Sequence, residues 1–245
     1  GQGRIVMLEI KPLASQEPSS RPSAAEQVFA QLQRQILSLE LEPGSKISEA
    51  ELAKALGVSR QPVRDAFFRL AKLGFLLIRP QRATTITLIS ENAVMRARAI
   101  RTALEVETVR TAAFTLNSED LDALDNVIEL QDVAVRAEDK QEFHRLDDLF
   151  HHEICTRAGV GFFWDLIAEN KGHMDRVRML SLSFASRDAW NDHVEIMRKL
   201  RARDVEGASE AIRDHLSRIR QQIDRIRAAN HEWFAPEETD LHLRG

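Results

Sequence analysis

The chain has 245 residues, 43% of them hydrophobic, which is enough to bury one large core or two ordinary ones. Its 34 basic and 38 acidic residues exclude a uniformly basic surface of the kind that coats nucleic acid without specificity. Its single cysteine, Cys155, excludes an internal disulfide or a cysteine-based zinc finger. The apolar run over residues 5–10 is too short for a membrane span or a signal peptide, so we expect a globular protein of the reducing cytoplasm.

Composition divides the chain into four parts. Residues 1–22 mix proline, serine and charge without an apolar period, which is typical of a flexible arm. Residues 23–90 hold nine basic and six acidic side chains, a net charge of +3, whereas the rest of the chain has a net charge of −7. This difference predicts a basic domain over 23–90 and a helical domain over 91–230, followed by a loose acidic tail over 231–245.

Three helices and a β-hairpin are predicted in the basic domain. A capping-box pattern, serine followed three residues later by glutamate, begins two of the helices at Ser23 and Ser48. A third helix is expected to begin with Ser59 as its cap and to stop at Gly74. The β-branched and aromatic residues on both sides of a basic turn predict a hairpin over 75–88.

The start of the third predicted helix carries residues that suit DNA. Arg60 and Arg64 are one turn apart on its exposed face, where a guanidinium can reach a guanine edge or a phosphate. The amides of the first turn and the hydroxyl of Ser59 suit a phosphate, and Pro62 is tolerated there because first-turn amides have no helical partner. In the hairpin, Arg82 can reach the adjacent DNA backbone. The simpler alternative is that these arginines only solvate an exposed face.

The sequence ISEAELAKALGVSRQPVRDAFFRLAKLGFLLIRP, residues 47–80, resembles the winged helix-turn-helix of the GntR family of bacterial transcription regulators. The resemblance implies DNA contacts from Ser59, Arg60, Gln61, Pro62 and Arg64, with Arg82 in the wing. Leu39 and Ala83 stand where the family usually has glycine, so the geometry of the wing departs from the pattern at Ala83. Ala50 stands where some members carry a DNA-contacting arginine, and that contact is therefore absent.

From residue 91 onward the apolar spacing is helical, and no strand pattern occurs. It predicts an antiparallel bundle of about six helices, over 91–115, 118–137, 140–158, 161–184, 187–202 and 205–229. The expected fold class is therefore mainly α, a winged helix-turn-helix followed by an all-α helical bundle.

Two aspartate–histidine pairs at i,i+4 spacing compete in the helix over 140–158. At about 100° per residue, Asp147 and His151 lie at the edge of the apolar stripe of this helix. Asp148 and His152 lie toward the opposite face. The spacing therefore predicts that Asp147 and His151 face the interior of the bundle.

His193 and His215 complete a candidate metal site. Each flanks an apolar stripe, and both lie at similar distances from a predicted turn near residues 203–204, so they are level in an antiparallel pair. With Asp147 and His151 they form a set that suits a divalent metal, Zn first and Ni, Mn or Fe as alternatives, with positions open for water or a ligand oxygen. The alternative is three separate histidines, each hydrogen-bonded in its own surroundings.

Three segments of the helical region, LDDLFHHEI, NDHVEIMRKL and AIRDHL, resemble motifs of the FCD effector domain found in the FadR subfamily of GntR regulators. The resemblance implies a ligand set of Asp147, His151, His193 and His215. Asp192 replaces the usual glutamate, outside that set. Six helices instead of seven are similar to the shorter, VanR-like branch.

The FCD resemblance also implies a small effector, commonly a carboxylate. Arg101 and Glu105 resemble the Arg-x-x-x-Glu of the first effector-domain helix, and an arginine facing small apolar residues suits a carboxylate. The structural alternative is an ion pair between these two residues within one helix.

We therefore expect a metal-containing, ligand-responsive transcription regulator, a repressor by preference, that acts as a homodimer on a palindromic operator in double-stranded DNA. One alternative is an enzyme in which the metal activates water against a small carboxylate, although no general base with a clear role is visible and the DNA-binding module would be unexplained. The other is a constitutive regulator whose metal is purely structural.

Overall fold

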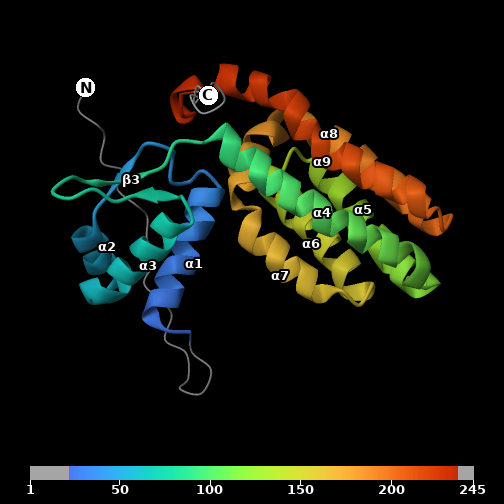
Figure 1. Cartoon of the computed structure of the whole chain (residues 1–245), viewed down its shortest axis with the longest axis horizontal. Coiled ribbons are helices and arrows are strands. Elements are labelled where there is room, and N and C mark those ends of the chain that lie inside the picture. The colour runs from blue at the N-terminus through green and yellow to red at the C-terminus, as the bar shows by residue number, and fades with distance from the viewer. Residues whose placement is uncertain (1–21, 237–245) are drawn as a thin grey trace, which may run out of the picture. The chain divides into compact units, whose positions relative to one another are not determined.

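The computed structural model describes residues 22–236 and contains two compact units (Figure 1). One unit runs up to Ile89 and resumes at His231, and the other runs from Ser90 to Asn230. The arm predicted over residues 1–22 lies, apart from its last residue, outside the described residues.

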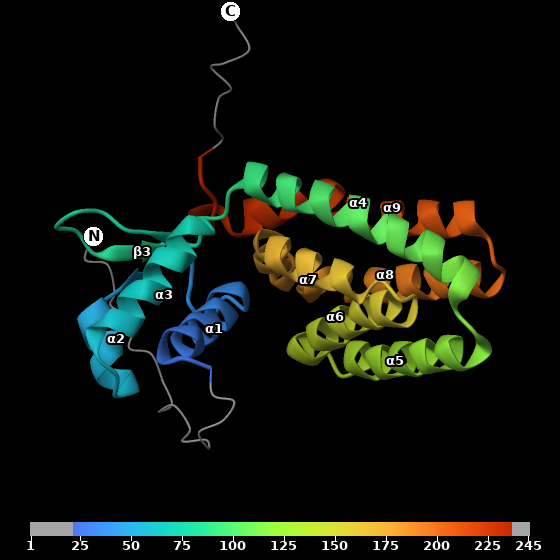
Figure 2. The same cartoon turned by 60° about the horizontal axis from the view of Figure 1, so that its bottom comes forward.

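The described part of the first unit holds three α-helices and a three-stranded sheet (Figure 2). The elements in chain order are α1 (Ala24–Leu37), β1 (Lys46–Ile47), α2 (Glu49–Leu56), α3 (Arg60–Lys72), β2 (Leu76–Leu77) and β3 (Thr84–Ile86). The central strand, β3, pairs antiparallel with both β1 and β2. The predicted hairpin is thus confirmed, whereas β1 was missed because two residues are too few to show an alternating pattern.

The helix ends of the first unit follow from local chemistry. Ser23 accepts a hydrogen bond from the Glu26 amide, and the Glu26 carboxylate accepts one from the Ser23 amide, so the predicted capping box begins α1. Gly57 ends α2 in the left-handed region at φ +68°, where a side chain would be strained. Ser59 does occupy the position before α3, but its hydroxyl makes no capping bond, so the predicted side-chain cap is wrong.

The core of the first unit is built from α1, α2, α3 and the inner face of the sheet. Its most deeply buried members include Val28, Leu32, Ile36, Val63, Leu70 and Ile86. The N-terminal end of α3 is left free of this core, because its apolar stripe begins only at Val63.

The second unit consists of six helices in its described residues, the number that the sequence predicts. They are α4 (Glu91–Thr115), α5 (Ser118–Arg136), α6 (Lys140–Arg157), α7 (Gly161–Asn170), α8 (Gly172–Arg201) and α9 (Val205–Ala229). The predicted boundary between the fourth and fifth helices is wrong, because α7 ends before Lys171 and α8 runs through residues 186–187. Neither glycine nor proline interrupts the chain there, and Ala185 and Ala189 on either side are both buried.

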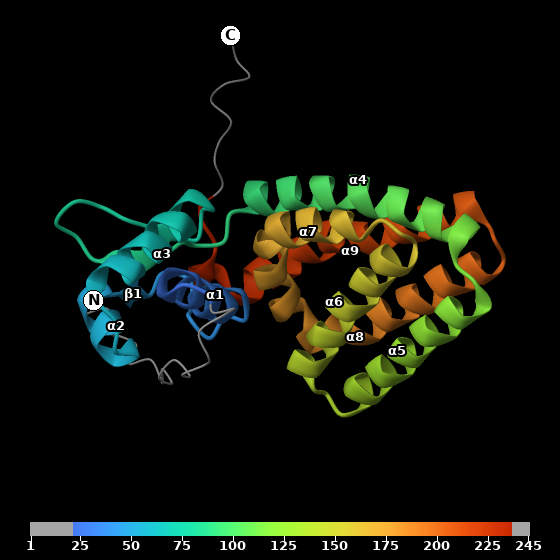
Figure 3. The same ribbon diagram turned by 90° about the horizontal axis from the view of Figure 1, so that it is seen from below.

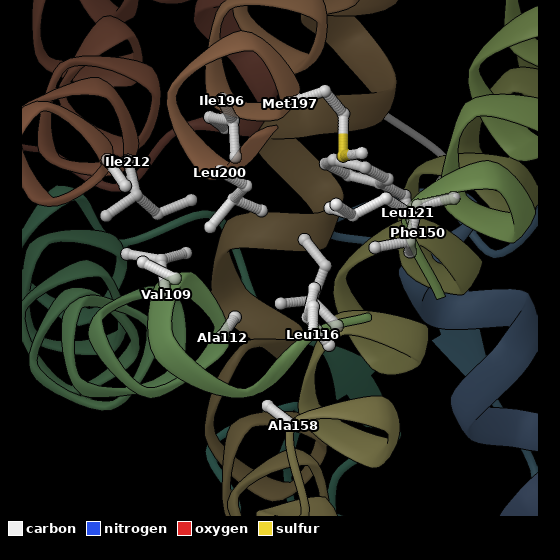
Figure 4. Packing of buried hydrophobic residues seen from close by; sticks show 14 of the residues in the cluster. Val109, Ala112, Leu116, Leu121, Phe150, Ala158, Ile196, Met197, Leu200 and Ile212 are labelled. Carbon is white, nitrogen blue, oxygen red and sulfur yellow. The ribbon is translucent and has the colours of Figure 1, made fainter. Parts of the chain in front are cut away.

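Antiparallel packing of long helices organises this bundle (Figure 3). α9 packs along α4 and α8, α5 packs on α6 and α8, and α7 covers α4 and α6. Side chains from five of the helices meet in one core (Figure 4), among them Val109, Leu121, Phe150, Ile196, Leu200 and Ile212. The apolar stripes that fill this core also fix which polar side chains are turned inward beside them.

Part of the predicted C-terminal tail is ordered. Residues 231–233 form a short 3₁₀ helix, and Phe234 is buried. The amide of Ile89 donates to the carbonyl of Trp233, and the amide of Ala235 donates to the carbonyl of Ile89, each over 2.8 Å. The prediction of a loose segment is therefore wrong for residues 231–236, because one buried aromatic leaves no periodic signal. Residues 237–245 lie outside the described residues.

Candidate metal centre and nucleic-acid interface

One carboxylate and three imidazoles meet inside the helical unit. Asp147 and His151 come from α6, His193 from α8 and His215 from α9, and all four side chains are buried. One potential ligand atom from each lies within 4.8 Å of all the others. His193 Nε2 lies 3.1 Å from Asp147 Oδ1 and 3.3 Å from His215 Nε2. His151 Nε2 lies 3.4 Å from the same carboxylate oxygen.

Helix periodicity places these side chains. Asp147 and His151 are one turn apart, so they share the inner face of α6. His193 and His215 come level because α8 and α9 are antiparallel and joined by a short turn. The ring of Phe150 lies 4.5 Å from that of His193 and walls the cluster on its apolar side.

Each imidazole uses its Nδ1 atom for a hydrogen bond to an oxygen outside the cluster. The acceptors are Glu105 for His151, Gln131 for His193 and Asp192 for His215. An imidazole that donates from Nδ1 keeps a lone pair on Nε2 when it is neutral. The three Nε2 lone pairs and the Asp147 carboxylate therefore face one another.

This arrangement fits a metal cation. Asp147 Oδ1 and His151 Nε2 are buried, and neither makes a hydrogen bond within residues 22–236. Buried polar atoms without partners are rare, because leaving them unpaired costs about 1–3 kcal/mol each. Three imidazole nitrogens and one carboxylate oxygen are donors that Zn²⁺, Ni²⁺, Mn²⁺ and Fe²⁺ accept.

The electrostatics keep most of the cluster deprotonated. Burial lowers the pKa of His193 to about 3 and also lowers the pKa of His215. Burial opposes ionisation of Asp147, but the Arg178 guanidinium and the neighbouring imidazoles outweigh it and hold the pKa well below its usual range. At His151, burial is outweighed by the Glu105 and Asp147 carboxylates, which raise its pKa.

Arg101 and Glu105 form a buried ion pair within α4. From the sequence, we considered this pair as the alternative to a role in effector binding. Arg101 Nε donates to Glu105, which also accepts from His151. Arg101 also lies beside the cluster of proposed metal ligands. It lines a cavity of about 20 Å³ together with Asp147, His215 and others. This volume is about that of one water molecule.

A second group of possible ligands already has its cation. His144, Asp148 and Asp175 lie together, and the ammonium of Lys171 is 3.1 Å from Asp148 and 2.6 Å from Asp175. The ammonium satisfies these carboxylates, so we assign this group a structural role.

The residues expected to contact DNA lie at the exposed start of α3. Arg60 and Arg64 both pair with one carboxylate of α2, Glu49, at 3.2 Å and 3.1 Å. The amide of the Gln61 side chain donates to Asp65 over 2.8 Å. Glu49 was missed in the sequence, because it lies 11 and 15 residues before its partners and only the turn between the helices brings it close.

The remaining predicted contacts lie nearby on the same unit. Ser59 is exposed, and Pro62 is half-buried in the first turn of α3. Arg82 is exposed in the wing, where Lys46, Arg79 and Arg82 line one hollow beside β3. Lys46 was not singled out in the sequence, because its strand was not predicted.

Known proteins resemble the chain over most of its length. Residues 24–86 match the family model described as bacterial regulatory proteins of the gntR family, and residues 97–218 match that of the FCD domain. The transcriptional repressor RspR of Escherichia coli K12 is 33% identical over 214 residues, covering 86% of this chain and 94% of that protein. An HTH-type transcriptional regulator from an unstable DNA locus of Streptomyces ambofaciens is 33% identical over 223 residues, covering 89% and 92%.

Solved structures give the same fold. E. coli McbR/YncC superposes with a TM-score of 0.70 at 23% identity, covering 86% of this chain and all of that one. A transcriptional regulator from Rhodococcus sp. RHA1, described as GntR, superposes with a TM-score of 0.67 at 21% identity. Within residues 22–236, every helix is too short or too polar to traverse a lipid bilayer.

Proposed function

Because the chain belongs to the GntR family of bacterial transcription regulators and carries an FCD domain, we propose that it senses a small carboxylate through a metal centre and so controls its own binding to an operator. Its relatives are transcription regulators, which sets aside the enzyme considered from the sequence. A repressor is the specific form that we propose.

DNA recognition is assigned to the start of α3 and to the wing. The proposed contacts are Ser59, Arg60, Gln61, Pro62, Arg64 and Arg82. The two arginines are 63% and 46% exposed in their side chains, so they can reach a base edge or a phosphate without repacking. A homodimer would present two such helices about 34 Å apart, one turn of DNA, which suits a palindromic operator.

The metal is assigned to Asp147, His151, His193 and His215, with Zn²⁺ as the first choice and Ni²⁺, Mn²⁺ or Fe²⁺ as alternatives. The observation that carries this assignment is the pair of buried ligand atoms without hydrogen-bond partners, Asp147 Oδ1 and His151 Nε2. When bound, the metal would supply a Lewis acid to which a carboxylate oxygen can bind.

Charge favours an anionic effector. The ligands and the side chains hydrogen-bonded around them hold three carboxylates and three guanidinium groups, on Asp147, Glu105, Asp192, Arg101, Arg178 and Arg218. These charges cancel, so a divalent cation leaves the buried site with an excess positive charge. A carboxylate reduces that excess, whereas an amine would increase it.

The effector contact is assigned to Arg101, held in place by Glu105. Arg101 lines the small cavity beside the metal ligands, and its ion pair fixes the direction of the guanidinium. Coupling to DNA requires only that the carboxylate bind more tightly when the two DNA-binding domains of the dimer take one spacing rather than another.

The test is metal analysis followed by thermal unfolding. We expect metal in the purified wild type and none in the His193→Ala/His215→Ala variant. A panel of small carboxylates should then raise the unfolding temperature of the metal-loaded wild type alone, because a ligand at 100 times its Kd stabilises by about 2.7 kcal/mol. Metal that stabilises the fold while no carboxylate does so would favour the constitutive regulator with a structural metal.

A further inference from the structure

Each of the four proposed metal ligands is held from outside by a different side chain. Glu105 and Arg178 hold the two ligands of α6: Glu105 accepts from His151 Nδ1, and Arg178 donates to Asp147 Oδ2 over 3.1 Å. The other two ligands, His193 and His215, are hydrogen-bonded by Gln131 and Asp192. Neither of these two side chains has been assigned a role above.

Gln131 fixes the proton of His193. It is fully buried on α5, and its amide nitrogen donates to the carbonyl of Leu146 over 3.0 Å. A carbonyl can only accept, so the amide nitrogen must face Leu146 and the amide oxygen must face His193. That oxygen lies 2.8 Å from His193 Nδ1. The Nδ1 atom therefore carries the proton, and Nε2 presents its lone pair to Asp147.

Asp192 does the same for His215 across a helix boundary. Its Oδ2 lies 3.0 Å from His215 Nδ1, and Arg218 binds both of its oxygens at 2.6 and 2.8 Å. Arg218 and His215 both belong to α9, so the carboxylate of α8 is clamped by the helix whose imidazole it orients. This fork is the geometry in which arginine restrains a carboxylate most strongly.

We propose that Gln131 and Asp192 are positioning residues of the metal centre, which hold His193 and His215 with Nε2 turned inward and thereby raise metal affinity. The proposal rests on the metal site of the proposed function and adds two side chains that hydrogen-bond to ligand imidazoles without being metal ligands themselves. The two supports differ in charge. A carboxylate on Nδ1 makes an imidazole a stronger electron-pair donor than an amide does, and the Arg218 guanidinium offsets part of that effect at Asp192.

The experiment measures Co²⁺ binding by visible absorption, in competition with a chelator, on metal-free protein. Gln131→Met removes the acceptor at similar volume, and Asp192→Asn removes the charge. Each should weaken Co²⁺ binding by about 10–100-fold. Asp192→Glu should restore affinity, and Asp214→Asn, which removes an exposed carboxylate of the same region, should leave it unchanged.

A second readout separates orientation from general damage. Nitrogen–proton correlation spectra of the metal-free protein report which ring nitrogen of each histidine carries the proton. His193 and His215 should both be in the Nδ1–H form in the wild type, and His193 should lose that preference in Gln131→Met.

The outcomes are distinguishable. Wild-type Co²⁺ affinity in both Gln131→Met and Asp192→Asn, with a wild type that binds metal, would overturn this inference and leave the proposed function standing. A wild type that binds no Co²⁺ would overturn the metal-dependent function and this inference with it. Weakened binding together with an unchanged proton position at His193 would also overturn the orienting role.

Discussion

Glu49 is expected to restrain Arg60 and Arg64, the two arginines proposed to contact DNA, and its removal tests that assignment. In the free protein its carboxylate lies 3.2 Å from Arg60 and 3.1 Å from Arg64. A phosphate must compete with this carboxylate for both guanidinium groups. Glu49→Gln keeps the size of the side chain and removes the competing charge.

The magnitude follows from the exposure of the partners. The two arginine side chains are 63% and 46% exposed, so each ion pair is worth about 0.2–1 kcal/mol. Loss of both pairs changes folding stability by little, but it frees up to about 2 kcal/mol of attraction for any phosphate. Affinity for DNA of unrelated sequence should therefore rise by about 2–30-fold.

The assay is fluorescence anisotropy with operator and scrambled duplexes over a range of salt concentrations. Freed arginines should steepen the salt dependence, because each phosphate neutralised adds about 0.9 to the logarithmic slope. Glu51→Gln is the matched control, since Glu51 is exposed in the same turn and is paired with neither arginine. Unchanged or weaker binding of scrambled DNA by Glu49→Gln would refute the competition.

Three further predictions concern the fold. Burial raises the pKa of the Cys155 thiol to about 11, so the native protein should resist iodoacetamide at pH 8 and react only when unfolded, whereas rapid native labelling would contradict the packing around it. Glu138 has a left-handed backbone at φ +54° and is exposed, so Glu138→Gly should stabilise by about 1 kcal/mol in urea unfolding, whereas Ala137→Gly, at φ −81°, should not. Burial opposes ionisation of Asp192, but His215 and Arg218 outweigh it and hold its pKa at about 2. Because this folded pKa lies below the unfolded one, ionised Asp192 stabilises the fold above about pH 4, and this stabilisation is lost as the pH falls toward 2. Urea unfolding of Asp192→Asn should lack that part of the acid dependence.

The spacing of residues along the helices was enough to predict most of the candidate metal site. The 3.6-residue period distinguished Asp147 and His151 from their neighbours Asp148 and His152, and the first pair is indeed the buried one. The level placement of His193 and His215 needed only a turn and two antiparallel helices. Both inferences depend on geometry within one helix or one hairpin, which sequence spacing encodes directly.

Contacts between distant segments could not be read in this way. Gln131 lies 62 residues before His193. Glu49 contacts Arg60 and Arg64 only because the turn between α2 and α3 brings the two helix starts together. The break between α7 and α8 at Lys171 was missed although Gly172 stands beside it, because a single glycine within a helical pattern does not by itself end a helix. Leu39 has a left-handed backbone at φ +65°, where the family usually has glycine. A leucine does not indicate this conformation, so the sequence could not predict it.

If metal and carboxylate together control DNA binding, as we propose, the affinity for the operator must depend on both. Anisotropy titrations would compare wild type, of measured metal content, with the His193→Ala/His215→Ala variant, each with and without the carboxylate that stabilises the wild type. We expect about one equivalent of metal in the wild type and a change in operator Kd with the carboxylate that the variant does not show. An operator Kd that stays the same with every carboxylate, in protein that holds its metal, would contradict the proposed control of DNA binding.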